Sequence, residues 1–205
     1  SEVAFKLLPR PKTEATLVFE GLEDTRAVAA MAAALGSPYE VTGAAHLPDG
    51  RTILRQEGFA ASVAYRADAL AGHLTGFGTC ARLDADESAA LWAGVRDVAP
   101  FHSVAGDVWR LSVKPSDAPA LVAQAGGRAL YDWGGGLVWL LQPEGADLRA
   151  SIAPFRGHAT LVRASLETRA RIAAFQPEPA PVAALAEGLR RRFDPRGILN
   201  PGLMD

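Results

Sequence analysis

The feature that most constrains the fold is an order of strand-like and helix-like segments that occurs twice along the chain. A strand is predicted where β-branched and aromatic residues are bounded by turn signals, and a helix where apolar residues recur every three or four positions. The first occurrence comprises, in order, a strand at 14–20, a helix at 24–35, strands at 40–47 and 52–57, a helix at 60–74 and a strand at 79–83.

Local signals support these boundaries. In the 24–35 segment, Val28, Met31 and Leu35 recur at helical spacing, Asp24 is the expected N-cap and Gly36 is placed to end the helix. Pro48-Asp49-Gly50 separates the two adjacent strands, and these residues supply a fixed φ and a permitted left-handed position. The pattern therefore predicts a helix followed by a β-hairpin.

The same order returns after a bridging helix at 87–98, which Asp84 or Asp86 would cap. Ser116-Asp117 is a good helix start, and Gly134-Gly135-Gly136 joins two strands in a second hairpin. The second occurrence comprises a strand at 108–113, a helix at 118–125, strands at 128–133 and 137–142, a helix at 146–155 and a strand at 158–163.

Two successive βαββαβ patterns predict an α+β fold. The units, at 14–83 and 107–163, are expected to be ferredoxin-like and to merge their strands into one antiparallel sheet with helices over one face. A doubly wound parallel fold would need strands and helices to alternate singly, and the two hairpins argue against it. A proline-rich connector at 176–181 then leads to a C-terminal amphipathic helix ending near Phe193.

Composition excludes several function classes. With 205 residues and 49% hydrophobic content the chain can bury a core, and a formal net charge of -2 leaves no basic excess for general nucleic-acid binding. The single cysteine, Cys80, excludes an internal disulfide framework and an iron–sulfur cluster, so we expect a reducing compartment and interpret Cys80 as a small buried hydrophobe. The uncharged runs are shorter than the roughly 20 residues that span a bilayer, so no membrane anchor is expected.

Common catalytic motifs are not found in the sequence. No glycine-rich loop precedes a helix as a phosphate site would require, and no Gly-x-Ser-x-Gly element is present. The four histidines lack metal-ligand spacing, so no metal site is predicted. Among them His158 precedes a strand and is expected at a sheet edge or domain face, either as a functional imidazole or as a capping or core residue.

Two arginines inside predicted strands are more informative. Arg55 follows Ile53-Leu54 and Arg110 lies between Trp109 and Leu111. A guanidinium on a covered sheet face must meet an acid or a ligand carboxylate. On an exposed face each would be solvated, and Arg55 has an equally good internal partner in Glu57 on the same side of its strand. Tryptophans 109, 133 and 139 also lie on these strands, as core residues or as one wall of a pocket; Trp139 is the pocket candidate.

The end of the chain, FDPRGILNPG at 193–202, resembles the C-terminal signature of FAD-linked oxidases of the vanillyl-alcohol oxidase type. Within that group, the segments 5–11, 43–48, 55–58, 63–66, 109–112 and 157–161 resemble the FAD-binding subunits of bacterial glycolate oxidases (glycolate dehydrogenases). The family commonly has a basic residue after the final Pro-Gly, whereas Leu203 follows here, so an anionic contact from that position is not expected.

The resemblance covers the C-terminal half of such a subunit. It implies three parts: a remnant of the flavin-domain junction at 1–13, a cap or substrate domain at 14–175, and a helix with its tail at 176–205. The strand-like stretch that begins at Glu2 is consistent with the first part, because it suggests a piece of something longer. FAD would then be bound by the full-length subunit through a preceding domain, and none is expected on this fragment. The implied partners are that FAD-binding domain, a sister flavin subunit and an iron–sulfur subunit, in the cytoplasm or in peripheral contact with the inner membrane through the complex.

The implied activity is oxidation of glycolate to glyoxylate, with the flavin as hydride acceptor. In that interpretation Arg55, Arg110 and Trp139 bind the small 2-hydroxy acid, His158 is the catalytic candidate, and Asn200 contacts the flavin side of the domain seam. The alternative hypothesis is a stand-alone ferredoxin-like ligand-binding or interaction module without redox activity.

Overall fold

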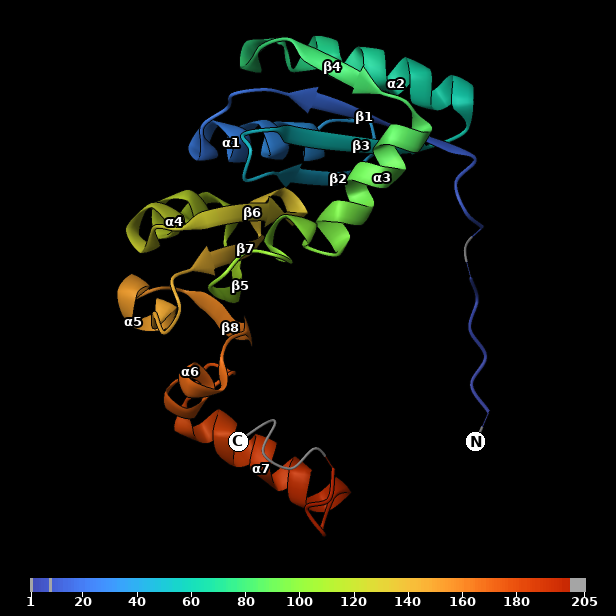
Figure 1. Ribbon diagram of the computed structural model, residues 1–205. Helices are drawn as coiled ribbons and strands as arrows, with labels where there is room; N and C mark the ends of the chain where they lie inside the picture. Colours follow the sequence, from blue (N-terminus) through green and yellow to red (C-terminus); the bar gives the residue numbers. More distant parts are fainter. Residues whose placement is uncertain (1, 8, 200–205) are drawn as a thin grey trace.

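In a computed structural model, which describes residues 2–7 and 9–199, eight antiparallel strands form one sheet in the order β4-β1-β3-β2-β6-β7-β5-β8 (Figure 1). The strands are β1 (Thr13–Phe19), β2 (Val41–His46), β3 (Thr52–Gly58), β4 (Cys80–Leu83), β5 (Asp107–Val113), β6 (Arg128–Asp132), β7 (Leu137–Gln142) and β8 (Gly157–Arg163). The predicted α+β class is confirmed.

Each half of the sheet comes from one of the two repeats. β1 lies between β3 and β4, and β5, its counterpart in the second repeat, lies between β7 and β8. The halves meet where β2 pairs with β6 through His46 and Tyr131. The predicted merging of two strand sets into one antiparallel sheet is therefore confirmed, and its midpoint is this short seam.

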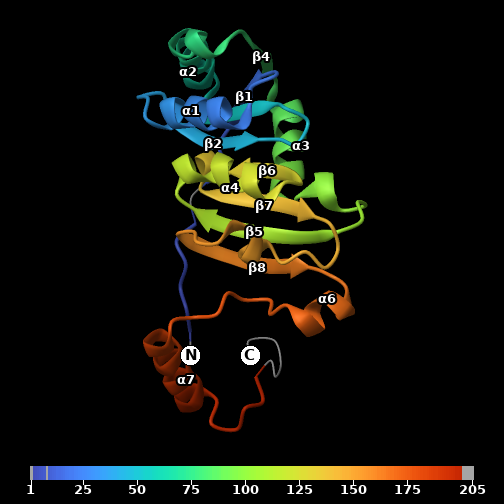
Figure 2. The same ribbon diagram turned by 90° about the vertical axis from the view of Figure 1, so that its left-hand side faces the viewer.

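Helices pack on both faces of the sheet, and not over one face as the sequence predicted (Figure 2). α1 (Asp24–Leu35), α2 (Ala60–His73), α4 (Ala118–Ala125) and α5 (Leu148–Ile152) share the larger core with strand residues such as Leu54 and Trp109. α3 (Ala85–Arg96), which links the two repeats, packs on the opposite face against residues such as Ile53. Adjacent residues of β3 thus enter different cores, as the alternation of side chains along a strand requires.

Of two predicted helix N-caps, one is confirmed and the other is wrong. Asp84 caps α3 as one of the two candidates, and its side chain accepts hydrogen bonds from the backbone of Asp86 and Glu87 in a capping box. Asp24 was the wrong cap for α1, because Glu23 occupies the N-cap position and the Asp24 carboxylate instead accepts a hydrogen bond from Tyr131.

The C-terminal part departs most from the prediction. α5 has five residues where ten were expected, and a short helix, α6 (Leu166–Arg171), was not expected; six residues give too little periodicity to detect. α7 (Ala180–Phe193) begins slightly earlier than predicted. The strand expected at residues 2–8 is not seen over 2–7, where the chain has no sheet partner.

Short 3₁₀ turns connect the longer elements: η1 (Thr75–Phe77), η2 (Ala99–Phe101), η3 (Pro115–Asp117) and η4 (Trp133–Gly135). In the part of the chain that the structure describes, no helix combines the length and the apolar character needed to cross a membrane.

Candidate functional site

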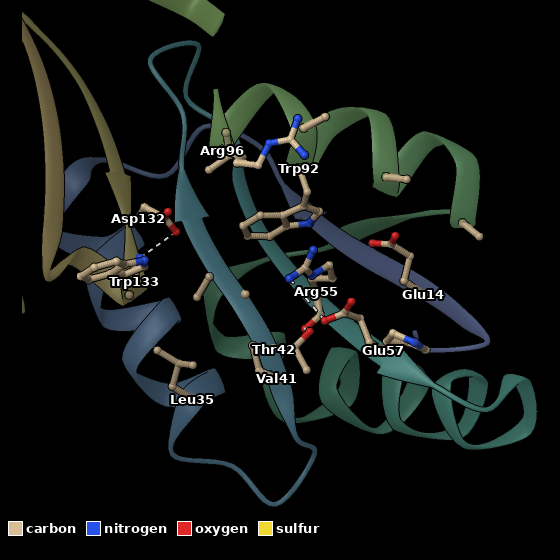
Figure 3. A pocket seen from close by; sticks show the side chains of 18 of the residues that line it. Glu14, Leu35, Val41, Thr42, Arg55, Glu57, Trp92, Arg96, Asp132 and Trp133 are labelled. Carbon is tan, nitrogen blue, oxygen red and sulfur yellow. Dashed lines mark hydrogen bonds and ion pairs between the residues drawn. The ribbon is translucent and has the colours of Figure 1, made fainter. Parts of the chain in front are cut away.

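A cleft of about 1050 Å³ opens on the face of the sheet that carries α3 (Figure 3). Its walls come from the chain just before and within β1, from β2, β3, β6, β7 and β5, and from one side of α3. Arg55, Arg110 and Trp139 all line it, so the fold brings together three site candidates from three separate strands.

The two arginines stand on opposite sides of this cleft. Four strand spacings separate β3 from β5, and at about 4.8 Å each this places the two backbones roughly 19 Å apart across the sheet. Arg110 is paired with Trp139 on the neighbouring strand β7. Arg55 and Arg110 are therefore two separate cations of the cleft.

Arg55 already has partners. Its Nη2 lies 3.3 Å from Oε2 of Glu57, so the alternative of an internal pairing is confirmed, and its guanidinium stacks over the Trp92 ring at 4.9 Å from the centroid. Its Nε is buried without a hydrogen-bond partner among the described residues. Arg55 is consequently a partly neutralised cation held on an aromatic platform.

A hydrogen-bond chain fixes that platform. Trp92 Nε1 donates to Thr16 Oγ1 at 2.9 Å, Thr16 and Ser88 hydroxyls are 2.7 Å apart, and Ser88 donates to Glu14 at 2.8 Å. Gly43 lies under the indole, where a Cβ would stand 2.8 Å from its Cη2. The position of the Trp92 ring therefore requires a glycine at position 43 as well as the buried hydrogen bonds.

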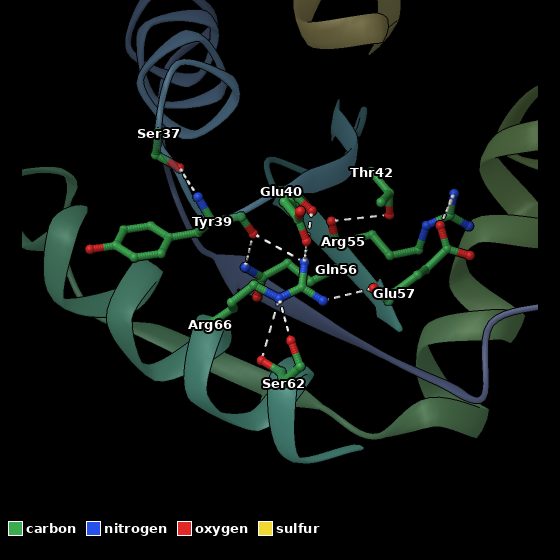
Figure 4. Close-up of polar contacts among 9 residues, drawn as sticks. All are labelled: Ser37, Tyr39, Glu40, Thr42, Arg55, Gln56, Glu57, Ser62 and Arg66. Carbon is green, nitrogen blue, oxygen red and sulfur yellow. Dashed lines mark hydrogen bonds and ion pairs between the residues drawn. The ribbon is translucent and has the colours of Figure 1, made fainter. Parts of the chain in front are cut away.

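Arg66 braces the floor of the cleft from beneath (Figure 4). This nearly buried side chain donates to the carbonyl of Glu57 at 2.8 Å, to the Glu40 carboxylate at 2.8 Å and to the carbonyl of Tyr39 at 3.5 Å. It ties the end of β3 to the loop before β2. The backbone that carries Arg55 and Glu57 is thereby held in place.

Arg110 differs from Arg55 in its surroundings. It is half-buried, it has no carboxylate partner within the described part of the chain, and its guanidinium lies 5.8 Å from the centroid of Trp133. Trp133 is 63% exposed and has a left-handed backbone at φ 53°. Such a conformation is unfavourable for a bulky residue, so an exposed indole held there beside a cation marks a candidate binding surface.

The sequence interpretation of the tryptophans is thus corrected in part. Trp109 is a fully buried core residue with Arg149 stacked on its ring, whereas Trp133 lies at the cleft and Trp139 is half-buried in its wall. Asp132, which sequence reasoning did not single out, also lines the cleft. Its position at the end of a strand, one residue before the Gly134-Gly135-Gly136 turn, was the available signal.

The remaining candidates lie elsewhere. His158 is exposed on β8, paired with Ser112 of β5, and does not line the cleft. Asn200 lies outside the described residues. Cys80 is half-buried at the edge of the larger core, and burial raises the pKa of its thiol.

In the part of the chain that the structure describes, no metal cluster is present and the glycine turn at the cleft does not fit a diphosphate. Over the described ranges, no cluster of three His, Cys, Asp or Glu side chains forms a metal site. The FAD that the resemblance implies would need a cradle for its diphosphate, but a Cβ on Gly134 would stand 2.5 Å from Leu35, and one on Gly135 3.1 Å from Val28. These glycines permit close packing against α1, so they do not fit a phosphate site.

The fold and the cleft define an α+β protein with a cleft lined by arginine and tryptophan side chains. Compared with known proteins, the chain is 30% identical over its whole length to the glycolate oxidase subunit GlcE of Escherichia coli (strain K12), and it spans 52% of that protein. No family model matches the chain. The resemblance to glycolate oxidase subunits is confirmed, and the chain corresponds to about half the length of such a relative.

Proposed function

We propose that this chain is the substrate-facing cap of a glycolate oxidase subunit and that its cleft binds the carboxylate of a small 2-hydroxy acid at Arg110. The observation that carries the proposal is a half-buried guanidinium, open to a cleft, without a carboxylate partner in the described structure. A guanidinium presents a planar pair of donors that matches a carboxylate, and desolvation strengthens the pair. The relative's name adds glycolate as the acid to test.

In this proposal the chain binds and orients the acid. Arg110 takes the carboxylate, while Trp139 and Trp133 flank it and reduce the access of water. Oxidation of glycolate to glyoxylate removes two electrons and two protons, and FAD held outside the described residues is the proposed electron acceptor. His158 stays the catalytic candidate, and because it is exposed on the edge strand β8, in this proposal it faces that other part of the subunit.

Two exposed apolar surfaces support a larger assembly. α7 has no buried residue and exposes Leu185, Leu189 and Phe193, while Val3, Phe5 and Leu7 are exposed before β1. Apolar surface of this extent is usually covered by a partner. We assign both surfaces to contact with the FAD-binding part of the subunit, and the assembled subunit to a cytoplasmic complex with a sister flavin subunit and an iron–sulfur subunit.

The test is titration of the 205-residue chain with glycolate, with binding monitored by two-dimensional NMR. Arg110→Ala is expected to weaken glycolate binding at least about tenfold, because a charge-assisted bidentate contact is lost. Arg96→Ala is the matched control, since Arg96 is a 74% exposed arginine on the rim of the same cleft, already paired with Asp97. Equal affinity in wild type and Arg110→Ala would contradict the proposal.

The second candidate is a stand-alone binding module without redox activity. The reading frame directly upstream distinguishes the two. An in-frame FAD-binding half supports the oxidase subunit, whereas a start codon at this point supports the module.

A further inference from the structure

Asp132 occupies a place in the cleft that the proposed carboxylate contact does not use. It ends β6 opposite Leu137 of β7, and Arg110 is paired with Trp139 two residues further along the same strand. Asp132 and Arg110 therefore flank β7 on the same face of the sheet, two strand spacings apart across it and two residues apart along it, so their backbones are roughly 12 Å apart.

The side chains close part of that distance. The Arg110 guanidinium lies over the Trp133 ring, and the Trp133 backbone N–H donates to Asp132 Oδ1 at 2.7 Å (Figure 3 shows this bond). Trp133 thus contacts both residues, and among the described residues Arg110 and Asp132 form no ion pair with each other. Both side chains line the same cleft, which can accept a small molecule carrying both an anionic and a donor group.

Only one oxygen of Asp132 has a structural task. Oδ1 caps the tight turn at Trp133, whereas Oδ2 has no hydrogen-bond partner among the residues described. A serine or asparagine would cap the turn equally well without a half-buried charge. Burial raises the pKa of Asp132, opposed by the Trp133 backbone bond and by the charge of Arg55, so its ionised form gains from a further hydrogen-bond donor.

We propose that Asp132 Oδ2 accepts a hydrogen bond from the hydroxyl of a 2-hydroxy acid whose carboxylate lies on Arg110. Asp132 is then the residue that distinguishes a 2-hydroxy acid from an otherwise equal carboxylate without the hydroxyl. This inference rests on the proposed function, because it takes the Arg110 contact as given. The physical reason is that an ionised carboxylate accepts a hydrogen bond from a hydroxyl group but forms none with the methyl group of an acid that lacks the hydroxyl.

The experiment compares glycolate with acetate, which lacks the hydroxyl, by NMR titration of the 205-residue chain near pH 7. Asp132→Ser keeps an oxygen that can cap Trp133 and removes Oδ2. Asp132→Asn keeps both the cap and the side-chain volume but places a neutral amide at the Oδ2 position. Asp86→Ser is the matched control, because Asp86 is an exposed carboxylate on α3 that lines the same cleft. Spectra of each free variant establish that it is folded.

Wild type and Asp86→Ser are expected to prefer glycolate over acetate by about tenfold, the scale of a hydrogen bond to a charged group. Asp132→Ser is expected to bind the two acids equally, and Asp132→Asn to show a reduced preference because neutral hydrogen bonds are weaker. A preference retained in both Asp132 variants, with Arg110→Ala weakening both acids, would overturn this inference and leave the proposed function standing. Absence of glycolate binding to wild type would overturn both.

Discussion

Removing one hydroxyl at the seam between the two halves of the sheet is expected to destabilise the protein. Tyr131 Oη donates to Asp24 Oδ2 at 2.6 Å, and Asp24 Oδ1 lies 3.4 Å from Nε2 of His46. His46 and Tyr131 are also the backbone pair that joins β2 to β6. The Tyr131→Phe variant deletes this cross-repeat hydrogen bond and leaves the ring in place.

The magnitude follows from the surroundings. A hydrogen bond to a charged group contributes about 1.5–3 kcal/mol, and the fully buried Tyr131 cannot form it with water instead. The Asp24 side chain is 42% exposed, however, so water replaces part of its lost partner. We expect the free energy of unfolding to fall by about 1–2 kcal/mol, or the melting temperature by roughly 2–8 °C for a chain of this size.

The effect should depend on pH in a defined direction. Contact with His46 is the main cause that lowers the pKa of Asp24, opposed by burial and assisted by the bond from Tyr131. Because the folded pKa lies below the unfolded value of about 3.9, the stabilisation is complete above that pH and is lost as pH falls through the folded pKa. The difference between Tyr131→Phe and wild type should therefore be full at pH 7 and shrink below about pH 4.

Urea unfolding at pH 7 and pH 3 measures both expectations. Tyr65→Phe is the control, because Tyr65 is 72% exposed and its substitution should change stability by less than about 0.5 kcal/mol. A Tyr131→Phe protein as stable as wild type at pH 7, or one destabilised equally at both pH values, would refute the reasoning.

Two further substitutions test the support of the cleft. Gly43→Val should displace Trp92 from Arg55, because the valine side chain would occupy the space of the indole. We expect the free energy of unfolding to fall by about 1–3 kcal/mol and the tryptophan emission to shift. Unchanged fluorescence and stability would contradict this prediction. Arg66→Met should lower the free energy of unfolding, measured in urea, by about 3 kcal/mol, because buried carbonyls lose their hydrogen-bond donor. The control Arg82→Met removes an exposed ion pair and should lower it by less than about 1 kcal/mol. Equal losses would argue against a supporting role of Arg66.

Short-range signals in the sequence predicted the elements well where the elements are long. The periodicity of Val28, Met31 and Leu35 gives α1, and the Pro48-Asp49-Gly50 turn, with Gly50 at φ 89°, gives the first hairpin. The same signals failed for Asp24, because a distant tyrosine competes for its carboxylate. A cap is a local preference, and a tertiary hydrogen bond overrode it.

The sequence by itself determined that Arg55 and Arg110 are strand residues, Arg110 between two apolar neighbours, and that two repeated units are present. Only the tertiary structure decided that the repeats join at His46 and Tyr131, which places β3 and β5 on one continuous face and both arginines in one cleft. It also showed that Arg55 forms an ion pair with Glu57. Arg110 instead lies over Trp133, in the cleft that Asp132 also lines. The reason is that alternation along a strand fixes which side chains share a face, whereas the order of strands across the sheet depends on long-range pairing.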